Sequence, residues 1–430
     1  MLHPLLRPVP APWQYEVSEL DSEYSWYILG VIQRPDYLER LATAVRRSPV
    51  TALLGPRQCG KTTLTRQFAR HRKATYFDLE SQADLRRLQN PELALRAERG
   101  LVVMDEIQAR PELFAVLRVL SDRPRSGTRF LVLGSASPDI VRGASETLAG
   151  RVEFVELGGF DLREAGAASW ERLWLRGGFP RSWLARSNDD SLAWREGLIR
   201  TFLERDVPQL GIDIPAPTMR RFWTMLAHYH GQTWNASAIA GSMGLSDKTV
   251  RSYLDILTGT FMVRQLQPWH ENLGKRQVKA PKVFLRDSGL LHSLLDITDR
   301  SALLAHPRAG ASFEGYAIEQ VLRAVAPTQA FFWGTYAGAE LDLFFVRDGR
   351  RHGVEVKFSE APTPTRSMRT AIEDLALDHL WLVYPGAHRY PAEENITVWP
   401  LRDVPALPAA LSRLRRTSRG RPAGAVSARS

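Results

Sequence analysis

The sequence predicts an α/β fold with a parallel sheet in its N-terminal part, and three short apolar runs carry this prediction. The runs lie at residues 50–54, 101–104 and 129–134. Continuous apolar runs of this length are typical of parallel strands, which are buried on both faces because helices cover each side of the sheet. Polar and amphipathic stretches separate the runs, and residues 33–47 place their apolar side chains on one helical face. Strands and helices therefore alternate, as a layered α/β domain requires.

Length and composition limit the possible classes of protein. With 430 residues, of which 44% are hydrophobic, the chain is long enough for two or three domains. Cys59 is the one cysteine, which excludes an intramolecular disulfide or a cysteine-based zinc site and favours a reducing compartment. No stretch approaches the roughly 18 apolar residues of a membrane span, so we expect a cytoplasmic protein without a membrane partner. The net charge of +10 supports a polyanionic partner such as nucleic acid but does not show one.

The first apolar run leads into a glycine-rich loop with the spacing GxxxxGK[ST]. Backbone N–H groups can turn towards a polyphosphate there because Gly55 and Gly60 have no Cβ in the way. Lys61 would reach the β- and γ-phosphates, Thr62 would offer a hydroxyl to Mg²⁺, and the next helix would direct its positive N-terminus at the anion. The loop predicts a site for ATP or GTP. The residues expected to contact the nucleotide are Gly55, Pro56, Arg57, Gln58, Cys59, Gly60, Lys61, Thr62 and Thr63.

Two acids follow the apolar run at 101–104. An acidic residue at the end of a buried strand can hold Mg²⁺ beside Thr62, and the next residue can polarise the water that attacks the γ-phosphate. We therefore expect Asp105 to bind the metal and Glu106 to act as the base. The arrangement is the Walker B pattern.

Three further residues are candidates for contact with the γ-phosphate. Ser135 and Ser137 follow the run at 129–134, where ATPases with an extra strand between the phosphate-loop and Walker B strands place a polar sensor residue. Arg151 lies at a helix-to-strand junction and is a candidate arginine finger, acting in cis or from a neighbouring subunit. A structural salt bridge is the alternative role for Arg151.

The middle of the chain predicts a helical region and then a winged helix-turn-helix. A short helix over 236–242 meets the turn Gly244-Leu245-Ser246, and Ser246 can cap a second helix. The exposed side of that helix and the wing that begins at 261–266 are basic, which is typical of DNA contact, although such modules in ATPases also bind proteins. The expected DNA contacts are Lys248, Thr249, Arg251, Lys275 and Arg276, with Ser252 on the same helix and Lys279 and Lys282 on the wing.

The pattern changes again from residue 311. Glu314 lies near the start of an amphipathic helix, and two strands then flank the turn at 348–349. Asp342 lies on the first strand, while Glu355 and Lys357 share a face of the second because side chains alternate along a strand. This constellation resembles the PD-(D/E)xK nucleases, in which Asp342 and Glu355 would hold Mg²⁺, Lys357 would position water and Glu314 would assist. A cross-strand charge pair on a solvated hairpin is the alternative.

Several motifs together resemble a widespread prokaryotic group of largely uncharacterised AAA-type ATPases. They are GPRQCGKTTL, LVVMDEIQ, FLVLGSAS, SETLAGRV, RGGFP and FLERDV, within a resemblance that spans residues 33–384. The resemblance implies a P-loop ATPase domain of the AAA type, a winged-helix segment and a restriction-endonuclease-like α/β domain, and it favours ATP over GTP. The chain departs from the family pattern at Cys59, where a small aliphatic residue is more frequent, and at Ala136, which interrupts a serine run.

The expected organisation has six parts and leaves three functions open. The parts are an N-terminal arm (1–28), the ATPase domain (29–170), a helical region (171–230), the winged helix (231–300), the nuclease-like domain (301–402) and a basic, disordered tail (403–430). The chain could be a Mg²⁺-dependent ATPase that acts on DNA, a nucleotide-gated switch or scaffold for protein partners, or a metal-dependent nuclease regulated by ATP. An arginine finger acting in trans would imply a homo-oligomer.

Overall fold

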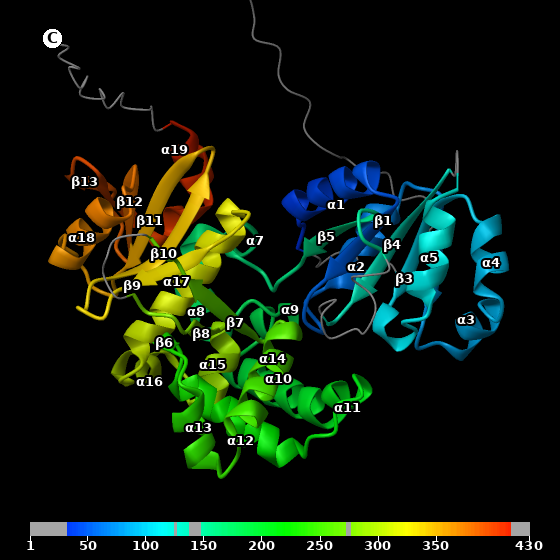
Figure 1. Ribbon diagram of the computed structural model, residues 1–430, viewed down its shortest axis with the longest axis horizontal. Helices are drawn as coiled ribbons and strands as arrows, with labels where there is room; N and C mark the ends of the chain where they lie inside the picture. Colours follow the sequence, from blue (N-terminus) through cyan, green and yellow to red (C-terminus); the bar gives the residue numbers. More distant parts are fainter. Residues whose placement is uncertain (1–31, 124–126, 137–147, 272–276, 414–430) are drawn as a thin grey trace, which may run out of the picture.

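Two sheets organise the chain, with helices between them and around them (Figure 1). The structure is a computed structural model that describes residues 32–123, 127–136, 148–271 and 277–413. The expected N-terminal arm, Ser137, Lys275 and Arg276 lie outside the described residues.

The first sheet has five parallel strands in the order β2-β3-β4-β1-β5, which confirms the predicted α/β fold. Strand β4 pairs with both β1 and β3, so an extra strand does separate the phosphate-loop strand from the acidic strand. The elements of this part are α1 (Pro35–Arg47), β1 (Val50–Leu54), α2 (Lys61–Ala69), β2 (Ala74–Asp78), α3 (Gln82–Arg87), α4 (Pro91–Ala97), β3 (Gly100–Asp105), η2 (Ile107–Ala109), α5 (Leu113–Ser121), β4 (Thr128–Gly134) and β5 (Val152–Glu156).

Helices cover both faces of this sheet, because neighbouring residues of each strand point to opposite sides. Leu53 packs into the apolar cluster that contains residues of α1 and α2. Ala52 packs into the cluster of the other face, where Leu117 of α5 contributes. All five strands run in one direction, so the carboxyl ends of β1, β3 and β4 lie at one edge. That edge is where an α/β sheet places its ligand.

A helical region follows β5 and lies next to the edge that carries the phosphate loop. Its helix α10 continues directly into one π-helical turn, η4, and then into α11. The elements are α7 (Leu162–Ala165), η3 (Ala167–Ser169), α8 (Trp170–Arg176), α9 (Pro180–Trp183), α10 (Asn188–Thr201), η4 (Phe202–Asp206), α11 (Val207–Gln209) and α12 (Ala216–His228). A π-helical turn inside an α-helix is rare, and where one occurs it often lies at a functional site.

The second sheet has nine strands in the order β13-β14-β12-β11-β10-β9-β7-β8-β6. Strand β7 pairs with β8 on one side and with β9 on the other. The sheet is therefore continuous across residue 300, where we expected a boundary between the winged helix and the C-terminal domain. The elements are β6 (Gln232–Thr233), α13 (Ala236–Met243), α14 (Asp247–Gly259), β7 (Val263–Pro268), β8 (Lys282–Leu285), α15 (Ser288–Leu294), α16 (Arg300–Ala305), α17 (Ala309–Val325), β9 (Phe331–Gly334), β10 (Glu340–Arg347), β11 (Arg350–Val356), α18 (Arg366–Asp374), β12 (His379–Tyr384), β13 (Tyr390–Glu393), β14 (Ile396–Pro400), η5 (Leu401–Ala406) and α19 (Leu407–Arg413).

The expectation of a disordered tail from residue 403 is wrong for its first part. Residues 403–413 belong to η5 and α19. Val404, Leu407 and Leu411 are all buried, and α19 packs against α17. The spacing of Leu407 and Leu411 gives the short helix an apolar face. In the sequence, the neighbouring basic and small residues make this pattern hard to recognise.

Within the described ranges, no helix combines the length and the apolar character needed to span a bilayer.

Candidate functional site

The glycine-rich loop connects β1 to α2 and has the backbone shape that its glycines permit. Gly60 has a φ of 101°, a left-handed conformation that an L-residue rarely adopts. A Cβ on Gly55 would lie 2.0 Å from the carbonyl oxygen of Leu157, so no larger residue fits there. The Lys61 ammonium is buried and donates to the carbonyl oxygens of Gly55 at 2.9 Å and Pro56 at 3.0 Å. The lysine is thus held inside the concave side of its own loop.

The acidic end of β3 meets the loop directly. The Thr62 hydroxyl donates to Oδ2 of Asp105 at 2.7 Å, and the N–H of Glu106 donates to Oδ1 of the same carboxylate at 3.0 Å. Burial raises the pKa of Asp105 more than the Thr62 hydrogen bond lowers it. A hydroxyl and a half-buried carboxylate in contact are oxygen donors of the kind that Mg²⁺ prefers, and a nearby cation would offset the partial loss of solvation of the charge. The donor set therefore fits Mg²⁺.

Glu106 is held by two polar neighbours. The Ser135 hydroxyl donates to its Oε2 at 3.3 Å, and Gln108 donates from Nε2 to the same oxygen and to Ser135 Oγ, the latter at 3.0 Å. The structure thus brings Ser135 to the expected base. Gln108 was not among the predicted site residues, although it closes the quoted motif LVVMDEIQ.

The side chain of Arg57 leaves the phosphate loop and joins three acids. Its guanidinium lies 2.6 Å from Glu80, 2.9 Å from Asp206 in η4 and 3.9 Å from Glu106. The arginine therefore ties the phosphate loop to the helical region instead of pointing into the cradle. Glu80 and Asp206 were not predicted as site residues, because no local spacing relates them to Arg57.

A second arginine, Arg34, supports the loop from outside. It is buried just before α1 and donates to the carbonyl oxygens of Cys59 and Gly158 at 3.2 Å and of Gly159 at 3.0 Å. Its Nε also binds Glu164 at 2.6 Å. One planar guanidinium thus connects the phosphate loop to the segment after β5. Sequence reasoning missed this role, since its partners are carbonyl groups that leave no sequence signal.

Arg151 lies at the wrong end of the sheet for the nucleotide of its own chain. It precedes β5, and Val152 pairs in parallel register with Val50 at the start of β1. The phosphate loop follows the other end of β1, about 16 Å away at about 3.3 Å per residue. The guanidinium binds Asp122 through Nε at 2.7 Å, on the surface. An arginine finger in cis is therefore excluded, and within its own chain Arg151 forms the salt bridge that was the alternative. Action from a neighbouring subunit stays a prediction.

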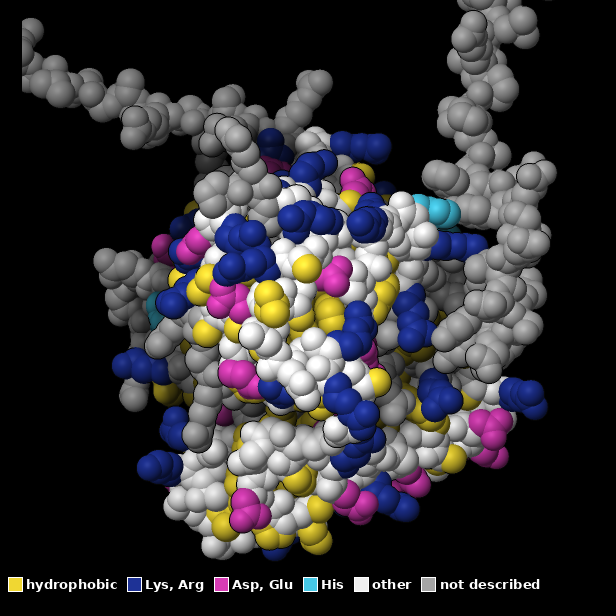
Figure 2. All heavy atoms as spheres, turned by 90° about the vertical axis from the view of Figure 1, so that its right-hand side faces the viewer, with side chains coloured by type: hydrophobic (Ala, Val, Ile, Leu, Met, Phe, Trp, Pro, Cys, Tyr) yellow, Lys and Arg dark blue, Asp and Glu magenta, His cyan; other side chains and the backbone are white. Residues whose placement is uncertain are grey.

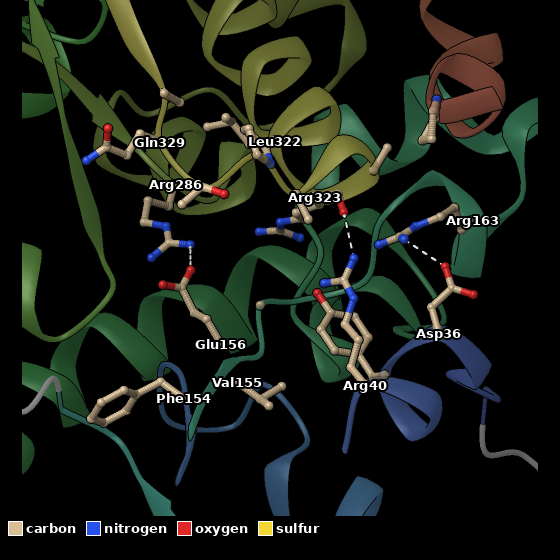
Figure 3. A pocket seen from close by; sticks show the side chains of 18 of the residues that line it. Asp36, Arg40, Phe154, Val155, Glu156, Arg163, Arg286, Leu322, Arg323 and Gln329 are labelled. Carbon is tan, nitrogen blue, oxygen red and sulfur yellow. Dashed lines mark hydrogen bonds and ion pairs between the residues drawn. The ribbon is translucent and has the colours of Figure 1, made fainter. Parts of the chain in front are cut away.

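The large cleft near the first sheet is separate from the phosphate loop. It has a volume of about 1100 Å³ and lies between α1 and β5 on one side and α17 on the other (Figure 3). Its arginines are engaged within the protein: Arg286 binds Glu156, and Arg163 binds Asp36 at 2.7 Å. The ion pair between Arg286 and Glu156 therefore connects elements of the two sheets across this cleft.

The residues predicted for a nuclease centre do come together at the second sheet. Asp342 Oδ2 accepts from the N–H of Val356 at 2.8 Å, and the Lys357 ammonium lies 2.8 Å from Glu355. Burial, and next the charge of Asp342, raise the pKa of both Glu314 and Glu355 to about 8. These side chains therefore lie near one another, and a nuclease centre stays a prediction.

The same centre also contains a lysine that we expected to face DNA. Lys282 of β8 is buried, and its ammonium lies 3.3 Å from Glu314 and 3.6 Å from Asp342 and also binds Glu340. The expectation for Lys282 is wrong, because its position on β8 places the side chain among the carboxyl groups of Glu314 and Asp342 instead of on the surface. In the part of the chain that the structure describes, no three His, Cys, Asp or Glu side chains are grouped to hold a metal. Because the Lys282 ammonium lies between Glu314 and Asp342, the residues at this centre do not fit Mg²⁺ in this conformation.

Of the residues of α14 expected to contact DNA, the two basic ones are exposed and Thr249 is half-buried. Ser246 caps α14 by accepting from the N–H of Thr249 at 3.1 Å, and Lys248 and Arg251 are exposed on that helix. Figure 2 shows a different face, the one on the right of Figure 1 that carries the first sheet, and there Lys and Arg side chains are spread among Asp and Glu.

Comparisons with known proteins match the chain along most of its length. A family model described as an AAA domain matches residues 47–166, and two models described as domains of unknown function (DUF8612 and DUF4143) match residues 167–301 and 309–404. Uncharacterised proteins of Mycobacterium tuberculosis and Mycobacterium bovis are each 50% identical to it over 396 residues, which is 92% of this chain and 89% of each relative. A Walker-type ATPase of Pyrococcus abyssi is similar over 62% of this chain and 96% of its own, with 15% identity and a TM-score of 0.45.

Proposed function

The chain belongs to the same family as the two mycobacterial proteins and carries an AAA domain, and from this premise we propose that it binds and hydrolyses ATP with Mg²⁺ and acts on DNA. The hydrogen bond between Thr62 and Asp105, at the mouth of the glycine loop, carries the proposal. It joins the hydroxyl and the carboxylate that would together hold the metal. No such pairing is needed for a loop that merely turns.

Each residue of the site has a separate task in this proposal. The loop N–H groups and Lys61 bind the phosphates, and the lysine exchanges its two carbonyl acceptors for phosphate oxygens. Thr62 and Asp105 would hold Mg²⁺, which neutralises phosphate charge when bound. Glu106 orients the attacking water, and Ser135 keeps its carboxylate in place.

ATP turnover by purified protein tests the first half of the proposal. We expect Lys61→Ala to lose nucleotide binding, while Lys73→Ala, an exposed lysine before β2, leaves turnover unchanged. We expect Glu106→Gln to keep ATP binding and to lower turnover by about 10² to 10⁴-fold, because the water loses its base. Turnover that persists in both Lys61→Ala and Glu106→Gln would show that the site is assigned wrongly.

Action on DNA is supported by the net charge of +10 and by the exposed basic residues of α14. Turnover should rise with duplex, single-stranded or branched DNA. Replacing both Lys248 and Arg251 by alanine should weaken DNA binding and lower its salt dependence by about one unit of slope for each phosphate that is no longer neutralised. Arg220→Ala, on the exposed side of α12, is the matched control.

The two other functions are separate outcomes of these assays. Turnover that is real but indifferent to every DNA would favour a nucleotide-gated switch or scaffold for protein partners. A Mg²⁺-dependent cleavage of DNA that Asp342→Ala abolishes, with ATP turnover intact, would favour the nuclease.

A further inference from the structure

We propose that the ammonium group of Lys282 takes the place of the divalent cation in the C-terminal carboxylate site, so that this site binds no divalent cation while β8 is in place. The site consists of Glu314 on α17, Glu340 and Asp342 on β10, and Glu355 on β11. The inference concerns this site alone and does not depend on ATP hydrolysis.

The surroundings of Lys282 show that it is a counter-cation and not a surface lysine. Its side chain is only 5% exposed, and an ammonium removed from water is stable only when anions surround it. Asp342 and Glu340 supply this negative charge, and the Glu314 carboxyl group also lies 3.3 Å from the ammonium. Although burial lowers the pKa of Lys282, these carboxylates raise it above its ordinary value, so the lysine stays charged.

Asp342 and Glu355, which would bind a metal, already contact other groups through three of their four carboxylate oxygens. Asp342 faces Lys282 with Oδ1 and accepts from the N–H of Val356 with Oδ2. Glu355 binds Lys357 with Oε1, and its buried Oε2 has no hydrogen-bond partner among the described residues. A divalent cation would have to displace Lys282, because both would occupy the space between Glu314 and Asp342.

Lys282 lies on β8, which is outside the C-terminal domain expected from the sequence at residues 301–402. In the antiparallel ladders of β8, Lys282 lies opposite Thr233 of β6 and Leu266 of β7. The strand is further held by Gly231, whose N–H donates to the carbonyl of Val283 at 2.8 Å. The helix-turn-helix segment thus supplies the cation of the C-terminal site, and the two form one unit.

Direct binding of Mn²⁺ to the full chain without nucleotide tests the inference, with free Mn²⁺ followed by electron paramagnetic resonance. All proteins would carry Asp105→Asn, so that the phosphate-loop site contributes equally. We expect no difference in Mn²⁺ binding between this background and the same protein with Asp342→Asn. We expect Lys282→Met to gain one Mn²⁺ site, because the substitution removes a unit positive charge within about 4 Å of the carboxylates. The Kd of this site should be at least about tenfold lower than that of any Mn²⁺ binding by the background protein that keeps Lys282. Adding Asp342→Asn to Lys282→Met should abolish the new site.

Two results would overturn the inference. One is Mn²⁺ binding by the protein with native Lys282 that Asp342→Asn removes, since the ammonium would then not exclude the metal. This comparison needs no change at Lys282 and stands even if Lys282→Met fails to fold. The other is a folded Lys282→Met protein, judged by circular dichroism, that gains no Mn²⁺ site.

Discussion

Asp206→Ala should weaken the connection between the phosphate loop and the helical region. Asp206 is buried at the end of the π-turn η4, and its carboxylate binds Arg57 at 2.9 Å. The Arg57 side chain is 15% exposed and also lies close to Glu80 and Glu106. The substitution removes one of three anions from a largely buried cation.

The magnitude follows from which charge is left without a partner. A hydrogen bond to a charged group contributes about 1.5 to 3 kcal/mol to the free energy of unfolding. After the substitution Arg57 still lies near Glu80 and Glu106, so Asp206→Ala should lower the free energy of unfolding by only about 1 to 2 kcal/mol. Arg57→Ala should lower the free energy of unfolding by more, about 2 to 3 kcal/mol, because it leaves the buried Asp206 beside Glu106 with only the exposed Arg205 as a nearby cation. Burial already raises the pKa of Asp206 against the effect of Arg57. The coupling free energy between the two residues should be about 1 to 2 kcal/mol.

A double-mutant cycle measured by urea unfolding at neutral pH gives this coupling directly. Arg205→Ala is the matched control, because Arg205 is the neighbour of Asp206 in η4 but is 54% exposed and lies 3.5 Å from Glu80. We expect the control to cost less than about 0.5 kcal/mol. A coupling below about 0.3 kcal/mol, or a control that costs as much as Arg57→Ala, would refute the reasoning.

Three further predictions concern the core and the support of the loop. Gly315→Ala places a Cβ 2.2 Å from Nε2 of the buried His230 and should destabilise by about 1 to 3 kcal/mol in urea unfolding, whereas Gly310→Ala on the same helix meets no atom within 4 Å and should be neutral or stabilising. Burial lowers the pKa of His292 to about 3, so between pH 6.5 and 4 the unfolded chain binds one more proton at this residue than the folded chain. As the pH falls through this range, the free energy of unfolding of the wild type should therefore decrease by about 1.4 kcal/mol per pH unit more than that of His292→Gln. Equal pH slopes of the two unfolding free energies would contradict this. Arg34→Lys should weaken ATP binding measured by calorimetry almost as much as Arg34→Ala, because an ammonium cannot reach the several carbonyl groups that the guanidinium contacts; full rescue by lysine would show that only charge matters.

Local patterns were sufficient where the chemistry lies within a few residues of the chain. The glycine loop, the helix after it and the acids at the end of a buried strand were all predictable from spacing, and the structure places Thr62 against Asp105 as expected. The parallel α/β sheet was predictable for the same reason, since its three central strands β3, β4 and β1 are each one largely apolar run. The roles of these residues in hydrolysis stay predictions that the turnover assays test.

Long-range pairing was beyond any local pattern. Arg57 and Asp206 are 149 residues apart, and nothing in GPRQCGKT or FLERDV relates them. Arg151 has a motif position that suits a catalytic arginine, yet strand direction places it at the opposite end of the sheet. A sequence shows which residues are present, but strand order and direction decide which of them meet.

The sequence by itself determined the phosphate loop, the acids of β3 and the class of the first sheet, because these depend on local spacing and on burial of short apolar runs. Only the tertiary structure decided that one nine-stranded sheet spans the helix-turn-helix segment and the C-terminal strands, and that Lys282 enters the carboxylate site. A basic residue on a predicted wing is ordinarily solvated. The pairing of β8 with β6 and β7 instead buries Lys282, and a buried ammonium lies where carboxylates stabilise it.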